Sequence, residues 1–160
     1  MLEALDSISM PYNQARLGFP KFRGYILGTS RGRFGRSKEG LSRLTKKYPD
    51  QWEIIKEWAF ENVPHDIEWN CVQVNKNLVC PVHKDKHNVG KSFIVSFGDY
   101  EGCNLVVDGV EHNTRYGLTF DGYIQEHYNT PLISGTKYSV VFFNNSLRHF
   151  SEFELKSNTA

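Results

Sequence analysis

The sequence lacks a cysteine framework, a membrane-length apolar run and a secretory start. Its three cysteines, Cys71, Cys80 and Cys103, form no CxxC pair, and their odd count argues against a disulfide framework and for a reducing compartment. No stretch approaches the roughly 18 apolar residues that a membrane span requires. The opening residues, MLEALD, have no basic start followed by an apolar run, as a secretory signal would. We therefore expect a soluble, intracellular protein.

Internal repeats and low-complexity linkers are also lacking. We expect a single domain over residues 1–160, which is long enough to bury a continuous core. Aromatic residues make up 14% of the chain, with 11 Phe and 8 Tyr, which suits a sheet-rich fold with large inward side chains. The pattern changes after Pro64, so residues 1–64 are expected to form a helical and basic cover and residues 65–155 a β-rich core.

The expected cover contains one strand and two helices. Residues 22–27 are aromatic and aliphatic and predict a strand, and residues 41–48 predict a short helix. A longer helix is expected over residues 51–62, because apolar side chains recur on one face. Trp58 lies off that face, where it would cover a sheet edge.

The rest of the chain has the pattern of short strands separated by turns. Alternating or continuous apolar residues predict strands at 67–73, 91–97, 104–107, 115–120, 123–127, 137–144 and 150–154. Residues 98–102 have the composition of a turn, and Asp108-Gly109 is a strong hairpin signal. Strands at this spacing predict a sandwich or barrel-like core, so the fold class is mainly β with N-terminal helices.

Two histidines and one aspartate carry the main chemical signal. His83 and Asp85 are two residues apart in a segment that is not helical, so both side chains can point to the same side. His127 comes at the end of the predicted strand 123–127. Two imidazoles and one carboxylate can form a face that holds non-haem Fe(II) and leaves three coordination positions open.

A basic residue, Lys137, follows His127 by ten positions. Lys137 begins the most hydrophobic strand, and a loop that turns at Pro131 and Gly135 would place this strand antiparallel to the one that carries His127. Lys137 would then lie near the metal ion. Because Lys137 and Ser139 share a face, an ammonium and a hydroxyl could together hold a carboxylate.

Simpler roles for these residues also fit the sequence. Asp85 could cap a turn, the two histidines could be ordinary polar residues near strand ends, and Lys137 could be solvated. A zinc site could use Cys80, His83 and His87, although a structural zinc site requires four ligands and the sequence offers no fourth one nearby.

With its HxD motif, distal histidine and basic residue ten positions later, the sequence resembles the Fe(II)/2-oxoglutarate-dependent dioxygenases. The resemblance covers roughly residues 69–144 and includes Asn88-Val89-Gly90 and the segments 96–102 and 118–122. It implies a double-stranded β-helix, which is a jelly-roll, cupin-like core. The chain departs from the commonest pattern with Lys137, where Arg is usual, and with Cys103 in a turn where Gly is more usual.

The resemblance implies roles for six residues. His83, Asp85 and His127 would bind Fe(II), and Lys137 with Ser139 would hold the far carboxylate of 2-oxoglutarate, with O2 as the second co-substrate. Asn75 or Asn77 would contact the co-substrate or the substrate, although a plain loop role is an equal alternative. Four aromatic residues would either shield the iron or simply form the core: Phe93, Phe120, Tyr138 and Phe142.

The substrate is indicated less directly. Residues 16–47 are rich in Lys and Arg, and this segment contains a glycine-rich loop with Arg31, Arg33, Phe34 and Arg36. Such a loop suits a phosphate backbone, with Phe34 stacking on a base, although a solvated basic face explains it equally well. A loose similarity to branches that oxidise the methyl group of a base points to DNA or RNA. A prolyl-type protein hydroxylase and a non-catalytic nucleic-acid-binding module remain alternatives.

Overall fold

The computed structural model describes residues 1–13, 19–29, 41–86 and 88–144. Its helices are α1 (Leu2–Asp6), α2 (Arg43–Lys47), α3 (Pro49–Asn62) and the 3-10 helix η2 (Thr114–Tyr116). Its strands are β1 (Tyr12–Asn13), β2 (Phe22–Gly28), β3 (Cys71–Lys76), β4 (Ser92–Phe97), β5 (Tyr100–Gly102), β6 (Leu105–Val107), β7 (Val110–His112), β8 (Leu118–Phe120), β9 (His127–Asn129), β10 (Leu132–Gly135) and β11 (Tyr138–Phe143).

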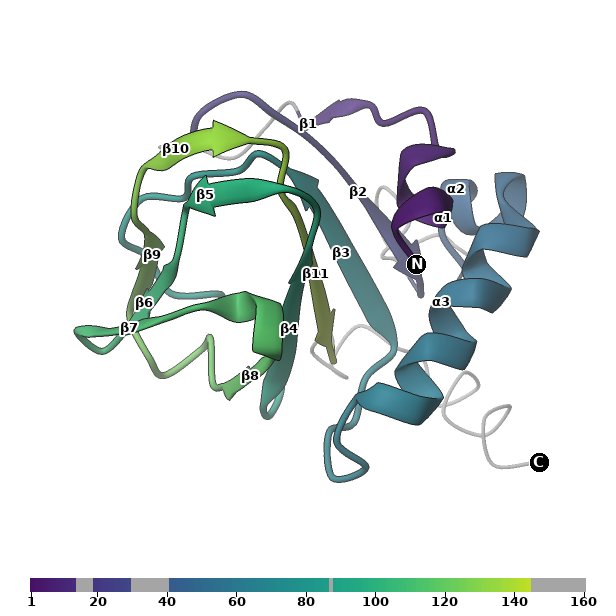
Figure 1. The fold of residues 1–160 in the computed structure, drawn as a ribbon. Helices are drawn as coiled ribbons and strands as arrows, with labels where there is room; N and C mark the ends of the chain where they lie inside the picture. The colour runs from purple at the N-terminus through teal and green to yellow at the C-terminus, as the bar shows by residue number, and fades with distance from the viewer. Residues whose placement is uncertain (14–18, 30–40, 87, 145–160) are drawn as a thin grey trace.

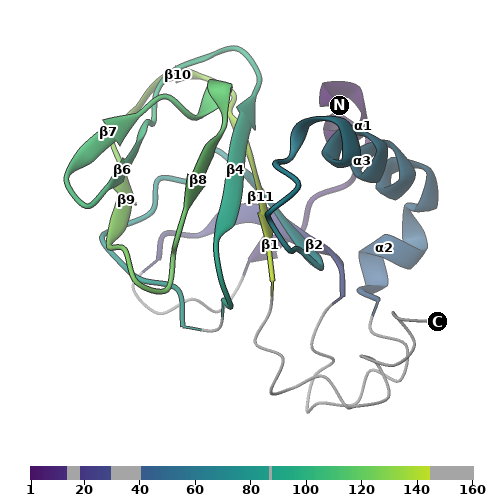
Figure 2. The same cartoon turned by 90° about the horizontal axis from the view of Figure 1, so that it is seen from below.

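The strands form one large sheet and two small ones. The large sheet has the order β1-β2-β3-β11-β4-β8, and the small sheets are β7-β6-β9 and β10-β5. All the strand pairs are antiparallel. The small sheets lie against one face of the large sheet, and the helices cover its other face (Figures 1 and 2). The predicted fold class, mainly β with N-terminal helices and a jelly-roll core, is confirmed.

Alternation along β11 separates a structural face from a functional face. Tyr138, Val140 and Phe142 belong to the main hydrophobic core, together with Ile55 and Ala59 of α3. Side chains at alternate positions of a strand point to opposite faces, so Ser139 and Val141 face the small sheets. The central strand of the large sheet therefore joins the helices on one side to the inter-sheet space on the other.

Helix α3 covers its face of the sheet mainly through aromatic contacts. It begins with Pro49, which suits the first turn because its missing N–H has no partner there in any helix. Trp58 stacks on Phe142, with ring centroids 5.9 Å apart, and meets Phe97 edge-on at 5.4 Å. Trp58 thus packs on the sheet itself, rather than on its edge as the sequence suggested.

A second, smaller hydrophobic cluster fills part of the space between the sheets. It consists of Ile94, Leu105, Val107 and Phe120, from β4, β6 and β8. The cluster holds the small sheet β7-β6-β9 against the large one. The rest of the inter-sheet space is lined by both polar and apolar side chains, described below. In the described part of the chain, no helix has both the length and the apolar composition to cross a membrane.

Most predicted elements are confirmed to within two or three residues. These are the strands at 22–27, 91–97, 104–107 and 137–144, the helices at 41–48 and 51–62, and the hairpin at Asp108-Gly109. For residues 115–120 only the second half is a strand, because the first half forms η2. The predicted strand at 150–154 lies outside the described residues.

Three predictions about elements are wrong. The strand expected at 67–73 begins only at Cys71, and the one expected at 123–127 is a turn before β9, which begins at His127. The expected turn at 98–102 contains β5, which pairs with the unpredicted β10. Strands of three or four residues are too short for alternation to show, so their partners decide their structure.

The strand that carries His127 and the strand after Lys137 are not neighbours in one sheet. Strand β9 pairs with β6, whereas β11 pairs with β3 and β4. Strand β10 lies between them in sequence and carries the chain from the small sheet to the large one. His127 and Ser139 therefore face each other across the inter-sheet space.

Candidate metal centre

His83 and His127 are brought together by the backbone. The segment between β3 and β4 forms an isolated antiparallel bridge with the start of β9, in which the amide N–H of each histidine donates to the carbonyl of the other at 3.0 Å. This bridge places the two imidazole rings 4.2 Å apart between centroids. The pairing fixes the two side chains on one side of a short ladder.

Asp85 completes a group of three. Its amide N–H donates to the carbonyl of Gly122 at 2.7 Å, which ties the HxD segment to the turn before β9. Nε2 of His83 lies 3.5 Å from Oδ1 of Asp85, and Nε2 of His127 lies 3.6 Å from Oδ2. One ligand atom from each residue lies within 4.8 Å of the others. The predicted shared orientation of His83 and Asp85 is thus present.

A backbone carbonyl orients each of the two imidazole rings by contacting its Nδ1 atom. Nδ1 of His83 lies 2.7 Å from the carbonyl oxygen of Pro81, and Nδ1 of His127 lies 2.8 Å from that of Gln125. A carbonyl can only accept, so each Nδ1 carries the proton and each Nε2 faces Asp85. Metal-binding histidines are commonly held in this way.

The charge state of His83 reflects its neighbours. Burial disfavours the charged imidazolium, but the Asp85 carboxylate, the Cys80 thiol and the Pro81 carbonyl outweigh burial and raise the pKa of His83 to about 9. A metal ion must therefore displace a proton from this ring. The carboxylate that favours the proton is the same group that would favour a cation.

Asp85 has two supports of its own. Nδ2 of Asn88 donates to Oδ2 of Asp85 at 3.3 Å. On the other side Gly122 packs so closely that a Cβ at this position would lie 2.2 Å from the same oxygen. Neither residue was predicted to act at the site, although both belong to segments on which the family resemblance was based. A single sequence does not show that the position of Gly122 requires a residue without a side chain.

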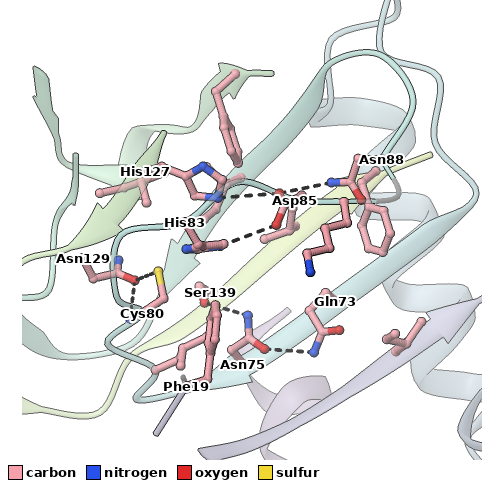
Figure 3. Close-up of a pocket in the computed structure, with 18 residues that line it drawn as sticks. Phe19, Gln73, Asn75, Cys80, His83, Asp85, Asn88, His127, Asn129 and Ser139 are labelled. Carbon is pink, nitrogen blue, oxygen red and sulfur yellow. Dashed lines mark hydrogen bonds and ion pairs between the residues drawn. The ribbon is translucent and has the colours of Figure 1, made fainter. Parts of the chain in front are cut away.

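The three donors lie at one end of a cavity of about 400 Å³ between the sheets (Figure 3). The cavity wall combines polar side chains of β3 and β11 with apolar side chains of β4, β6 and β8. Its lining includes Gln73, Asn75 and Ser139, opposite the candidate ligands, and Asn129 and Phe120 beside them. A chelating ligand bound to the metal would extend over the polar wall.

A chain of amide groups leads to Ser139. Nε2 of Gln73 donates to Oδ1 of Asn75 at 2.9 Å, and Nδ2 of Asn75 donates to Oγ of Ser139 at a longer 3.5 Å. Ser139 therefore accepts on one side and keeps its own proton to donate. The predicted residues Asn75 and Ser139 thus lie together on the cavity wall, joined by Gln73, which alternation on β3 places on the same face.

Lys137 comes directly before β11 and is not among the residues that line the cavity. Its side chain is 2% exposed, and its amine donates to the backbone carbonyl of Cys103. Burial lowers the pKa of Lys137, the Cys103 and Cys80 thiols partly offset this, and Arg115 lowers it further. No carboxylate of the described residues forms an ion pair with it. The amine is therefore a buried cation that has only neutral acceptors.

Asn129 and Cys80 were not predicted to contribute to the site as they do. Oδ1 of Asn129 accepts from both the amide N–H of Cys80 at 3.1 Å and its thiol at 2.7 Å. This contact ties the start of the HxD segment to β9. Asn129 follows His127 by two residues, so alternation on the strand was a signal that could have revealed it.

Of the four aromatic residues expected either to shield the iron or to form the core, Phe120 alone lines the cavity. Its ring meets the ring of His127 edge-on at 5.1 Å. Phe93, Tyr138 and Phe142 belong to the core under the helices, on the other face of the sheet. Phe19, which was not predicted, meets His83 edge-on at 4.8 Å and also lines the cavity.

Some predicted site residues lie outside the described part of the chain. These are Arg31, Arg33, Phe34 and Arg36 of the basic loop, and His87 of the alternative zinc site. Within the described part, one group of three candidate ligands is present, and it contains His83, Asp85 and His127 rather than Cys80.

Comparisons with known proteins bear on the fold. No family model and no curated sequence matches the chain. Among solved structures, NgTET1 in complex with 5mC DNA is similar with a TM-score of 0.61 and 12% identity, over 85% of this chain and 68% of that one. An oxidoreductase of the 2OG-Fe(II) oxygenase family from Burkholderia pseudomallei gives 0.56 and 15%, over 91% and 80%.

A Pseudomonas putida prolyl-4-hydroxylase gives a TM-score of 0.45 at 13% identity, over 84% of this chain and 77% of that one. At these identities the likeness to the first two structures concerns the fold. Together with the converging HxD and distal histidine, it agrees with the resemblance seen in the sequence. The chain has the jelly-roll fold of the 2-oxoglutarate- and Fe(II)-dependent oxygenases.

Proposed function

We propose that this protein is an Fe(II)- and 2-oxoglutarate-dependent dioxygenase that hydroxylates a C–H bond, with a methyl group of a base in nucleic acid as its substrate. One observation carries the proposal. The Nε2 atoms of His83 and His127, each fixed by a carbonyl behind it, face the carboxylate of Asp85 at the end of a cavity. This is the donor set of a 2-His-1-carboxylate iron site with open positions.

The residues present fit the metal and the co-substrate. His83, Asp85 and His127 would hold Fe(II), and two neutral imidazoles with one carboxylate leave room for ligands that carry charge. When bound, iron and 2-oxoglutarate together supply the oxidation of a C–H bond by O2, with succinate and CO2 as products. The role of the chain is to place the reactants and to exclude water.

The polar wall suits the far end of 2-oxoglutarate. Ser139 has a hydroxyl proton to donate, and Asn75 holds its oxygen from the side. Lys137 precedes Ser139 by two residues and is buried, and an amine that meets only neutral acceptors is costly to keep charged there until an anion pairs with it. We assign Lys137 and Ser139 to the distal carboxylate and Asn75 to orienting Ser139.

The remaining part of the cavity wall suits a planar polar substrate. The rings of Phe19 and Phe120 lie next to the candidate metal ligands His83 and His127, and Gln73 and Asn88 offer amide groups. Lys86 reaches the lining from an exposed position, where it could meet a phosphate. A base would have to be flipped out or single-stranded to enter. The similar NgTET1 structure contains 5mC DNA, which supports this class of substrate.

The class of reaction is tested with metal and co-substrate alone. Anaerobic addition of Fe(II) and 2-oxoglutarate should give a weak visible charge-transfer band, and admission of O2 should produce succinate. His83→Ala, Asp85→Ala and His127→Ala should each lose bound iron and succinate formation. His65→Ala is the control, because His65 packs against the exposed Phe60 away from the cavity. A wild-type protein without band or succinate would instead indicate a non-catalytic module.

The substrate is tested by mass spectrometry after turnover. Single-stranded and duplex oligonucleotides that contain thymine or 5-methylcytosine should gain oxygen on the methyl group, and proline-containing peptides should not change. Oxidation of a peptide with no change in any nucleoside would transfer the assignment to a protein hydroxylase.

A further inference from the structure

Asn129 lines the cavity and follows His127 by two residues, so both side chains lie on the same face of β9. Its side-chain oxygen is fully occupied, because Oδ1 accepts from the amide N–H of Cys80 at 3.1 Å and from the Cys80 thiol at 2.7 Å. The backbone N–H of Asn129 donates in turn to the carbonyl of Cys80 at 3.0 Å. These three bonds hold the side chain in one orientation.

The bonds to Cys80 also determine which end of the Asn129 amide is free. A backbone N–H can only donate, so the atom that meets it is the oxygen, and Nδ2 points away from it. In the described part of the chain, Nδ2 has no hydrogen-bond partner. The buried side-chain polar atoms without a partner there are the hydroxyls of Tyr25, Ser92 and Tyr100, so Nδ2 is accessible. Asn129 therefore offers a free NH2 group at the cavity wall.

Backbone contacts define the two ends of the cavity. Asn77 lies beside the start of β11, where its amide N–H donates to the carbonyl of Lys137 and its Oδ1 accepts from the Lys137 amide N–H, both at 2.8 Å. Val89 lies beside the end of β11, where its amide N–H donates to the carbonyl of Asn144 at 2.9 Å. Early positions of the segment 77–89 therefore lie toward the start of β11, and later positions toward its end.

Asn129 belongs to the end of the cavity near the start of β11, because its partner Cys80 comes early in this segment. Ser139, the second residue of β11, lines the same end from the large sheet. Figure 3 shows Cys80 and Asn129 on the side of Ser139, and Asn88 on the far side of Asp85. The Asn129 amide and the Ser139 hydroxyl are thus two neutral donors, one from the small sheet and one from the large sheet.

We infer that Asn129 binds the co-substrate directly: its Nδ2 donates to the distal carboxylate of 2-oxoglutarate from the small sheet, while the Ser139 hydroxyl donates from the large sheet. The inference rests on the proposed function and adds a second wall to the co-substrate site. A carboxylate only accepts, so it suits two donors. Because the bonds to Cys80 already fix the Asn129 side chain, this donor loses little freedom when the ligand binds.

The test compares Asn129→Asp with Asn129→Ala, because a binding role and a structural role predict opposite orders of affinity. The first change keeps an acceptor for Cys80 and replaces the donor with a negative charge, whereas the second removes both groups. Equilibrium titration of 2-oxoglutarate into Zn(II)-loaded protein avoids turnover, because zinc has no redox chemistry. Kd should rise about tenfold in Asn129→Ala, the effect of one hydrogen bond to a charged group. It should rise further in Asn129→Asp, where repulsion adds to the lost bond.

A second ligand and a second asparagine provide the controls. Oxalate chelates a metal ion but has no distal carboxylate, so its Kd should change little in either Asn129 variant. Asn113→Asp is the control for the substitution, because Oδ1 of Asn113 also accepts from a backbone N–H, that of Arg115 at 3.1 Å. Asn113 is exposed and is not among the residues that line the cavity, so this variant should bind 2-oxoglutarate as the wild type does.

The outcomes separate the inference from the proposed function. If Asn129 only ties Cys80 to β9, Asn129→Asp should bind 2-oxoglutarate almost as the wild type does, and more tightly than Asn129→Ala. That order, or wild-type affinity in both variants, overturns the inference while the proposed function stands. Equal losses for oxalate and 2-oxoglutarate would place the effect at the metal end and overturn it as well. A wild-type protein that binds no 2-oxoglutarate in the presence of Zn(II) overturns both.

Discussion

At the scale of single residues, the missing side chain of a glycine matters at this site as much as the side chains that are present. Gly122 contributes no side chain, and its backbone carbonyl accepts from the amide N–H of Asp85. The φ of Gly122 is outside the left-handed region, so its backbone would accept another residue. A larger residue is excluded at position 122 by the Asp85 carboxylate, which occupies the space that its side chain would need.

Gly122→Ala should therefore displace the Asp85 carboxylate and lower Fe(II) affinity by about tenfold, as losses of support around metal ligands commonly do. Iron binding is measured by anaerobic titration. Gly109→Ala is the control, because Gly109 has a φ of 79° but no atom within 4 Å of an added Cβ. It should lower stability and leave iron binding intact. Equal iron affinity in the two variants would contradict the role given to Gly122.

The buried amine of Lys137 should lower the free energy of unfolding relative to an apolar side chain at the same position. A buried charge without an ionic partner is replaced by an apolar side chain of similar size at no loss, and often with a gain, of stability. We expect Lys137→Met to raise the free energy of unfolding by about 1–2 kcal/mol. In the same variant KM for 2-oxoglutarate should rise at least about tenfold.

Thermal unfolding without ligands and the kinetics of succinate formation give the two values. Lys76→Met on β3 is the control, since Lys76 lies on the helix-covered face of the sheet, opposite the cavity. A Lys137→Met variant that loses stability and keeps its KM would place the anchor elsewhere.

At the scale of elements, the sequence predicted what local patterns determine. Helix α3 and strands β2, β4 and β11 have clear periodicity, and the HxD spacing placed His83 and Asp85 on one side. The pairing of strands was less accessible. Strands β5, β9 and β10 contain three or four residues each, and β10 carries the chain from one sheet to the other.

The same limit applies to the candidate site. The three candidate metal ligands could be predicted because their residue types are distinctive, because His83 and Asp85 are two residues apart, and because the distal histidine fits the family pattern. Gln73, Asn88 and Asn129 are ordinary amides in sequence, and they acquire a role only because the fold places them around the cavity. The Lys137 amine contacts the carbonyl of Cys103, which is distant in sequence and stands out there only as an unusual residue in a turn.

Helix α3 offers a test of how far the two faces of the large sheet are independent. Trp58→Ala removes the ring that stacks on Phe142 and meets Phe97, and it should lower the free energy of unfolding by about 3 kcal/mol. Chemical denaturation measures this value. Phe60→Ala on the same helix should have little effect, because Phe60 is 78% exposed. Similar losses in both variants would show that the loss reflects the helix itself rather than its aromatic contact.

At the scale of the whole molecule, one sheet serves two purposes on opposite faces. The helix-covered face contains most of the apolar core, and the other face carries Ser139 and the cavity that Asp85 lines. If the proposed function holds, metal and co-substrate would join the large sheet to the small sheets, where the protein itself has the smaller of its two hydrophobic clusters. Ligands should therefore contribute substantially to the stability of the complete fold.

Fe(II) with 2-oxoglutarate, added anaerobically at a thousandfold excess over the dissociation constant, should stabilise the wild type by about 4 kcal/mol, because only the folded state binds them. Asp85→Ala should lose this gain while keeping its stability without ligands. Trp58→Ala should start from a lower stability and keep the full gain, since Trp58 packs on the far face of the sheet. If Trp58→Ala loses the ligand-dependent gain together with its intrinsic stability, the two faces of β11 are coupled, and the helices take part in forming the site as well as in stabilising the sheet.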